Sequence, residues 1–195
     1  MAYEPTWLEM LLSKLVFLLY GRSVYKPFAE RLPLYDGERV LDFGCGSGAV
    51  AYYTAKRLSR GHLTCLDISE RRLNACRKTL RRYNNIFYLR SEATVLLRNS
   101  FDVVYCHFVL HEISAIELER VVPALAKSLK TGGIFVFREP LNEAEKLSVI
   151  KHLATHNGLV LKDSRITDAP LVGNALESVY IYSHVLTHKT MEVLS

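Results

Sequence analysis

The sequence predicts an α/β fold: a Rossmann-like, seven-stranded, mainly parallel sheet with helices on both faces and an antiparallel last strand. Three patterns point to this class. Apolar strand-like runs alternate with helix-like segments over most of the chain. The first of these runs, residues 39–43, leads directly into a glycine-rich turn. Near the C-terminus, two apolar runs follow each other with no clear helix between them, which predicts an antiparallel hairpin. At 195 residues, 49% of them hydrophobic, one domain over 1–195 is expected.

An N-terminal helical lid, residues 1–33, is expected to precede the core at 34–195. The helical stretch should break near Gly21 and at Pro27, because glycine and proline interrupt helices. Residues 7–20 are very apolar but shorter than the ~20 residues that a spanning helix needs. An amphipathic or lid helix, or a dimer contact, is therefore expected, with a helix on a membrane surface as the alternative. No secretory signal is predicted.

The remaining elements follow from periodicity and punctuation. Ser69 is a predicted helix N-cap, Pro123 falls inside a helix, and Gly132-Gly133 is a stop signal. Strands are expected at 39–43, 62–66, 86–89, 101–106, 134–138, 159–162 and 179–186, and helices at 49–59, 69–83, 114–130 and 142–157.

The glycine-rich turn is the first candidate binding element. Gly44, Gly46 and Gly48 allow positive φ and close approach of a ligand, and the next helix offers free N–H groups. This spacing alone fits a dinucleotide as well as S-adenosylmethionine. Asp42, two residues before the first glycine, disfavours a pyrophosphate and favours a ligand with an ammonium group. Asp67, at the end of the second strand, suits the ribose of either ligand.

Several ordered motifs together resemble those of the class I S-adenosylmethionine-dependent methyltransferases, closest to the small-molecule branch that includes ubiquinone and menaquinone methyltransferases. The resemblance covers roughly residues 35–140 and implies the seven-stranded sheet with its last strand antiparallel. Ser91 and Glu92 stand where the family has Gly-Asp, which is a departure from its pattern. The matching segments are 40–48, 66–69, 91–93, 100–104, 107–113, 129–133 and 138–140.

This resemblance implies S-adenosyl-L-methionine as cofactor and a transferase reaction on a small, apolar or aromatic acceptor. The residues implied to bind the cofactor are Asp42, Phe43, Gly44, Cys45, Gly46, Gly48, Asp67, Ile68, Glu92, Ala93, Cys106 and His107. The residues expected to line the acceptor pocket are Tyr20, Tyr25, His111 and Glu139.

Two histidines after the fourth strand, His107 and His111, are the candidate catalytic residues. Methyl transfer from a sulfonium mainly requires alignment, so a general base is needed only for a protonated acceptor. A histidine of near-neutral pKa suits that role. Their four-residue spacing would also fit a metal on one helix face, but no third ligand accompanies them and no metal is predicted.

Charge and cysteine content leave two alternative functions. The formal charge is +5, and six arginines and lysines lie between 71 and 82. An RNA-directed methyltransferase that uses these residues is one alternative. A solvated helix face is the favoured interpretation, so nucleic acid is not an expected partner. A non-catalytic cofactor-binding scaffold is the other. The four cysteines lack paired spacing, which favours reduced thiols and a cytoplasmic location. The expected partner is a small-molecule acceptor, with no transmembrane span; a homodimer is left open.

Overall fold

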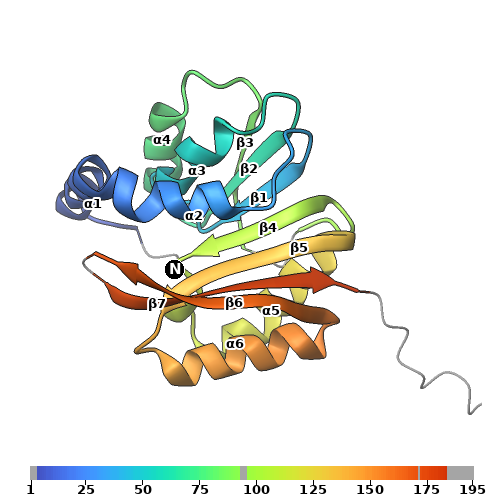
Figure 1. Cartoon of the computed structure of the whole chain (residues 1–195). Coiled ribbons are helices and arrows are strands. Elements are labelled where there is room, and N and C mark those ends of the chain that lie inside the picture. Colours follow the sequence, from blue (N-terminus) through green and yellow to red (C-terminus); the bar gives the residue numbers. More distant parts are fainter. Residues whose placement is uncertain (1–3, 93–95, 171, 184–195) are drawn as a thin grey trace, which may run out of the picture.

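The computed structural model of the chain describes residues 4–92, 96–170 and 172–183. Its centre is a seven-stranded sheet in the order β3-β2-β1-β4-β5-β7-β6 (Figure 1), in which β7 runs antiparallel to both of its neighbours. The predicted fold class is thus confirmed. The strands are β1 (Arg39–Phe43), β2 (His62–Asp67), β3 (Ile86–Arg90), β4 (Phe101–His107), β5 (Leu129–Pro140), β6 (Leu159–Ala169) and β7 (Gly173–Tyr182).

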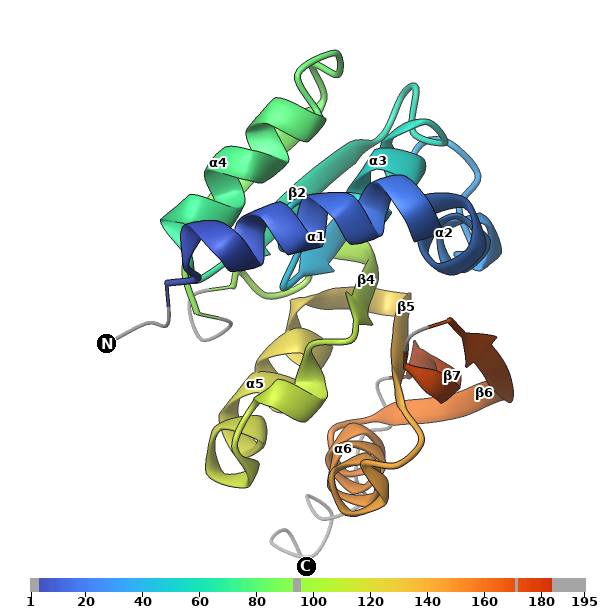
Figure 2. The same ribbon diagram turned by 90° about the vertical axis from the view of Figure 1, so that its left-hand side faces the viewer.

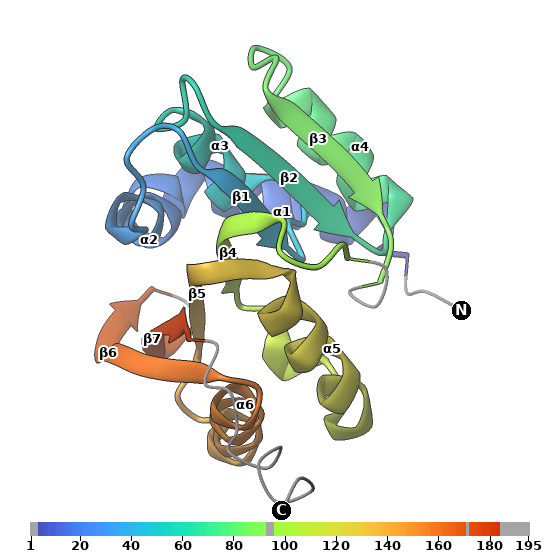
Figure 3. The ribbon, with the colours of Figure 1, turned by 90° about the vertical axis from the view of Figure 1, so that its right-hand side faces the viewer.

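Helices cover both faces of the sheet. Figures 1 and 3 show α5 and α6 together on the face opposite to α2, α3 and α4. The helices are α1 (Trp7–Tyr20), the π-helical η1 (Gly21–Tyr25), α2 (Lys26–Arg31), α3 (Ala49–Ala55), α4 (Glu70–Thr79), the 3-10 helix η3 (Leu110–Glu112), α5 (Ala115–Ser128) and α6 (Ala144–His156).

The core is divided by the sheet into two hydrophobic clusters. Along β4, Val103 and Tyr105 join the cluster under α2, α3 and α4, while Val104 and Cys106 join the one under α5 and α6. This alternation is the two-residue period of a strand buried on both faces. It explains why β4 reads as a continuous apolar run in the sequence.

The N-terminal helices differ from the prediction at Pro27. The break at Gly21 is present as a π-helical turn, and a Cβ there would come within 2.9 Å of the Tyr53 hydroxyl. Pro27, however, lies in the first turn of α2 and causes no break. The prediction was wrong because a first-turn N–H has no partner within the helix, so its absence is tolerated.

The C-terminal hairpin is confirmed but is longer than predicted. β6 continues to Ala169 and β7 begins at Gly173, whereas strands were expected only at 159–162 and 179–186. Residues 184–186 of the last expected strand lie outside the described residues. β6 is an edge strand, and most of its side chains from Val160 to Asp168 are exposed. Because such a strand carries little apolar pattern, the sequence does not show its full length.

Two arginines fasten the N-terminal helices to the core. Arg57 donates to the carbonyl oxygens of Ala29, Glu30 and Leu32 at 2.5–3.0 Å, which satisfies the free carbonyls at the end of α2. Arg31 binds Glu177 of β7 through two hydrogen bonds, of 2.8 Å and 2.5 Å. Since Glu177 is only 2% exposed, this pair holds α2 firmly against the sheet.

Replacing Gly61 by alanine is expected to lower the free energy of unfolding by about 3 kcal/mol. A Cβ on Gly61 would lie 2.9 Å from the Glu38 nitrogen and 3.0 Å from the Asp36 oxygen, and neither backbone atom can move freely. Chemical denaturation of Gly61→Ala beside Gly37→Ala measures the effect, since a Cβ at Gly37 meets nothing within 4 Å. Equal stability of the two variants would contradict this packing.

Candidate functional site

The glycine-rich turn joins the end of β1 to α3. Gly44, Gly46 and Gly48 have φ of +73°, +53° and +84°, so all three use the left-handed region that favours glycine. The nitrogens of Gly44 and Cys45 both donate to the Leu66 oxygen at 2.9 Å, which fixes the turn against β2. A Cβ on Gly46 would meet nothing within 4 Å, so the turn is open there to a ligand.

Asp67 at the end of β2 holds this turn in place. One carboxylate oxygen accepts from the Gly46 nitrogen at 3.0 Å and the other accepts from the Ser69 nitrogen at 2.9 Å. The side chain is buried, and this burial raises its pKa. A carboxylate has about four acceptor positions, so Asp67 can receive further donors from a bound hydroxylated ligand.

Glu4, in the segment before α1, contacts the residues that follow Asp67. The Glu4 carboxylate accepts from the Ser69 hydroxyl at 2.7 Å and from the Glu70 nitrogen at 2.9 Å, at the start of α4. The Ser69 hydrogen bond is the main cause of the lowered pKa of Glu4. Sequence reasoning missed Glu4, because the contact joins residues 66 positions apart.

Helix α1 then crosses the glycine-rich turn. The Ser13 and Ser47 hydroxyls are hydrogen-bonded at 3.1 Å. In Figure 2, α1 runs from the start of α4 towards α2, in front of the ends of β1 and β2. The carboxyl edge of the parallel strands, where ligands bind in such sheets, is therefore covered by the N-terminal segment.

Asp42 lies beneath the turn, in β1. It is 3% exposed and accepts a hydrogen bond from the Tyr105 hydroxyl at 2.8 Å. Burial raises its pKa well above the usual value. The predicted contact of Asp42 with an ammonium group stays a prediction, and its contact within the protein is Tyr105.

His107 ends β4 inside an aromatic cluster. Its ring centroid lies 5.4 Å from that of Tyr25, 4.7 Å from that of Phe28 and 4.4 Å from that of Phe108. Its Nε2 atom is buried without a hydrogen-bond partner. Burial, with the nearby charge of Arg138, lowers the pKa of His107 to about 3. The ring is therefore neutral and a weak base at pH 7.

Backbone strain occurs immediately after His107. Phe108 has a φ of +56°, which is uncommon for a residue other than glycine. Its nitrogen donates to the Arg138 oxygen of β5 at 2.8 Å. This backbone conformation directs the chain so that Val109 lies against the glycine-rich turn. A Cβ on Gly44 would lie only 2.5 Å from Val109 Cγ1.

His111 and Glu139 form a hydrogen-bonded pair beside this loop. His111 Nδ1 lies 2.6 Å from a Glu139 carboxylate oxygen. The other oxygen accepts from the Val109 and Leu110 nitrogens at 3.0 Å and 2.9 Å. Glu139 is fully buried, whereas the His111 side chain is 22% exposed. The hydrogen bond to Glu139 raises the pKa of His111 above its usual value.

Known proteins match this chain in sequence and in structure. The family described as "Methyltransferase domain" matches residues 40–133. "Phosphoethanolamine N-methyltransferase" of Triticum aestivum is 31% identical over 112 residues. "Ubiquinone/menaquinone biosynthesis C-methyltransferase" of Wigglesworthia glossinidia brevipalpis is 30% identical over 115 residues. Residues 40–133, slightly less than half of this chain, are therefore similar to a methyltransferase domain.

These alignments cover only parts of the methyltransferases concerned. They include 55% of this chain and 22% of the wheat enzyme, and 54% of this chain and 45% of the Wigglesworthia enzyme. The crystal structure of the N-methyltransferase NodS from Bradyrhizobium japonicum WM9, in complex with S-adenosyl-L-homocysteine, has a TM-score of 0.69 at 16% identity. That alignment covers 80% of this chain and 85% of NodS, and it shows the shared fold.

The other predicted site residues lie in different surroundings. Phe43 and Cys106 are buried in the core, and burial raises the pKa of the Cys106 thiol. Ile68 and Glu92 are exposed near the end of β2 and after β3. Ala93 lies outside the described residues. On the acceptor side, Tyr20 and Tyr25 are half-buried, and burial raises the pKa of Tyr25.

Two hollows lie at the opposite edge of the sheet. One of about 470 Å³ is lined by Tyr35, Asp102 and Lys130 among others, and one of about 230 Å³ by Arg98, Lys127 and neighbouring residues. Both adjoin the amino ends of β4 and β5, away from the glycine-rich turn. Because ligands of such sheets bind beyond the carboxyl ends of the strands, we do not assign the cofactor to either hollow.

Proposed function

We propose that this protein transfers a methyl group from S-adenosylmethionine to a small apolar or aromatic acceptor, with His111 as general base. The observation that carries the proposal is the 2.6 Å contact between His111 Nδ1 and the buried carboxylate of Glu139. This contact orients the ring and leaves Nε2 as the atom that can accept a proton. A carboxylate that fixes the tautomer of a histidine is a recurring device of general-base catalysis.

The glycine-rich turn and Asp67 fit the cofactor. The open space beside Gly46 admits a ligand close to the backbone, and Asp67 has free acceptor positions for ribose hydroxyls. The carboxylates of Asp67 and Glu4 near this edge disfavour a phosphate. When bound, the cofactor supplies an activated methyl group on its sulfonium, so the protein's task is alignment and exclusion of water.

His111 suits the role of base better than His107 does. The efficiency of a base is greatest when its pKa is near the working pH. Burial lowers the pKa of His107 to about 3, whereas Glu139 raises that of His111. His107 instead offers a buried Nε2 without a partner, which suits a hydrogen bond to the acceptor.

The aromatic cluster supports an apolar or aromatic acceptor. Tyr25, Phe28 and Phe108 surround the His107 ring, next to the loop that carries His111. Flat apolar surfaces of this kind stack well on aromatic groups. Two contacts within the protein weigh against the RNA alternative. Arg77 of α4 forms an ion pair with Glu70 at 3.0 Å, and Arg71 donates a hydrogen bond to the Pro5 carbonyl oxygen.

A reducing compartment fits the cysteines. Cys45, Cys65, Cys76 and Cys106 are all buried and free. We infer a cytoplasmic location on that basis. No helix among the described residues is long and apolar enough to cross a membrane.

A labelling experiment tests the proposed activity. The protein is incubated with S-adenosylmethionine carrying a tritiated methyl group and with a cell extract, which is then separated into small-molecule, RNA and protein fractions. We expect label in an organic-soluble small molecule, and at least roughly 100-fold less with His111→Ala. Label only in RNA or protein fractions would contradict the proposed acceptor class.

A further inference from the structure

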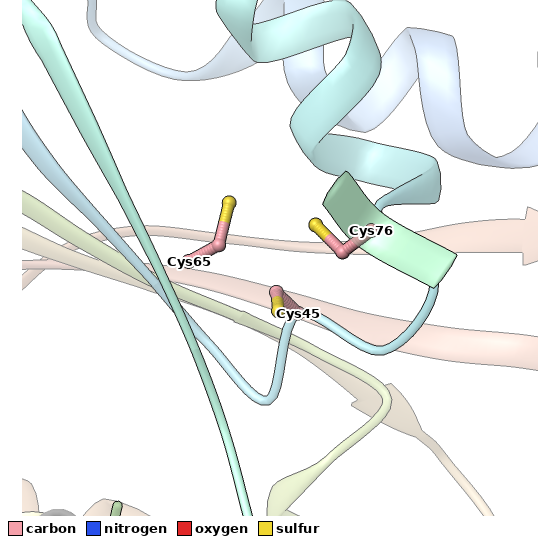
Figure 4. A group of neighbouring side chains, drawn as sticks. All are labelled: Cys45, Cys65 and Cys76. Carbon is pink, nitrogen blue, oxygen red and sulfur yellow. The ribbon is translucent and has the colours of Figure 1, made fainter. Parts of the chain in front are cut away.

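Three cysteines from separate elements meet beneath the glycine-rich turn. Cys45 comes from the turn, Cys65 from β2 and Cys76 from α4, and Figure 4 shows the three side chains grouped together. Their sulfur atoms all lie within 4.8 Å of one another. All three side chains are buried, and none forms a disulfide.

We propose that Cys45, Cys65 and Cys76 form a binding site for a soft d10 metal cation. Three thiolates around such an ion at metal–sulfur distances of about 2.3 Å would have their sulfurs about 4 Å apart. The observed grouping needs only a small adjustment to reach that geometry. Soft thiolate ligands select monovalent copper and zinc over magnesium or calcium.

The surroundings favour monovalent copper over zinc. Structural zinc almost always takes four protein ligands, and the described residues offer no fourth histidine, cysteine or carboxylate in this group. Copper(I) is satisfied by fewer soft ligands.

An ion here would connect the turn to α4. Cys45 stands between Gly44 and Gly46, and a Cβ on Gly48 would lie 2.9 Å from the Cys76 sulfur. Binding would therefore link the turn, β2 and α4, and the stabilisation would grow with the logarithm of the ion affinity. The metal site does not depend on the proposed methyl transfer.

Metal titration of the reduced, chelator-treated protein tests this site. Copper(I) is added in competition with a copper(I) chelator, and zinc and cadmium are added in separate titrations. We expect one ion per chain, a thiolate-to-metal absorption band, and a higher melting temperature. Copper(I) should bind more tightly than zinc.

Single cysteine variants locate the ligands. Cys45→Ser, Cys65→Ser and Cys76→Ser should each weaken binding at least roughly 100-fold, as loss of a ligand does for thiolate sites. Cys106→Ala is the matched control, because Cys106 is buried on the other face of the sheet. Its binding should remain unchanged. Equal loss in Cys106→Ala, or no thiolate band in wild-type protein whose far-ultraviolet circular dichroism is native, would overturn the proposal.

A second, independent observation concerns the outer face of α1. Seven large apolar side chains on this helix are 47–75% exposed, and no residue of α1 is buried. Their spacing of three and four residues puts them on one face. The opposite face is already occupied, by Ser13 against Ser47 and by Phe17 against Tyr52. The seven residues, the α1 apolar face, are Trp7, Leu8, Leu11, Leu12, Leu15, Leu18 and Leu19.

We infer that the α1 apolar face docks on the surface of an anionic lipid bilayer. Lys14 is exposed on α1, and Arg22 is exposed just after its end. Cations beside an exposed apolar helix complement an anionic surface. A second copy of this chain would bring the same cations to the contact, so a bilayer fits the charges better. The proposed membrane docking does not depend on the proposed methyl transfer.

Vesicle flotation tests the docking. The protein should float with vesicles containing phosphatidylglycerol, and much less with phosphatidylcholine alone or at high salt. Leu11→Glu should reduce this binding at least roughly tenfold. Ile116→Glu, at an apolar position on α5 that is more exposed than Leu11, should not. Equal binding of Leu11→Glu and wild type, or a wild-type dimer by light scattering that Leu11→Glu dissolves, would overturn the inference.

Discussion

Asp67→Ala is expected to weaken cofactor binding at least roughly tenfold and to lower the free energy of unfolding by about 2 kcal/mol. The buried carboxylate accepts from the Gly46 and Ser69 nitrogens, and alanine leaves both donors without a partner. It also removes the acceptor assigned to the ribose. Calorimetry with S-adenosylhomocysteine measures the affinity, and urea unfolding without ligand measures the stability.

Two further variants separate these effects. Asp67→Asn keeps one acceptor oxygen and should lie between alanine and wild type in stability. Asp163→Ala is the surface control: Asp163 forms an ion pair with Arg165 while half exposed, and such pairs contribute about 0–1 kcal/mol. Lower stability of Asp67→Ala with unchanged affinity would show that the ribose contact is misplaced.

His111→Ala is expected to lower the methyl-transfer rate by roughly 10²- to 10⁴-fold for an acceptor that must lose a proton. Cofactor affinity should remain unchanged, because His111 is assigned to the acceptor side. The variant should fold, since the Val109 and Leu110 nitrogens still donate to Glu139. His152→Ala provides the control, because this histidine lies exposed on α6.

The hydrogen-bonded pair of His111 and Glu139 predicts that the methyl-transfer rate depends on pH. Only the neutral ring can accept a proton, so the rate should rise with pH through the raised pKa of His111. Glu139→Gln removes the charge that favours the protonated ring, so this limb should move to lower pH. Nuclear magnetic resonance titration of the His111 ring reads the pKa without any acceptor. A pKa that is the same in wild type and Glu139→Gln would refute the role of Glu139.

The free energy of unfolding should change with pH in the opposite direction to the methyl-transfer rate. Because the folded-state pKa of His111 is raised above its unfolded value, the stabilisation from the pair is complete below the unfolded pKa. It is lost as the pH rises through the folded pKa. Urea unfolding of wild type and His111→Ala over this range should show that the variant lacks this pH dependence.

The fold was predictable because its main signals are local. Alternating strands and helices, the glycine-rich turn after β1 and the missing helix before β7 are all visible within short windows of sequence. The full length of β6 was not, since an exposed edge strand needs no apolar pattern. Pro27 does not break α2 because it lies in the first turn of that helix. The sequence does not show this, since the ends of helices are the least reliable part of such predictions.

The sequence predicts candidate site residues, which stay a prediction, but it does not predict the contacts between them. His111 and Glu139 were both identified, yet their pairing depends on the parallel register of β4 and β5, which places His107 opposite Arg138. The Tyr105 partner of Asp42 depends on the register of β1 and β4 in the same way. Glu4 gave no local signal, because its role is to cap a helix that begins far along the chain.

Calorimetric titration of the wild-type protein with S-adenosylhomocysteine and, separately, with NAD tests the proposed cofactor site most directly. The glycine-rich turn, Asp67 and Glu4 predict that S-adenosylhomocysteine binds at one site per chain and that NAD does not bind. Binding of NAD without binding of S-adenosylhomocysteine would contradict the assignment of this site.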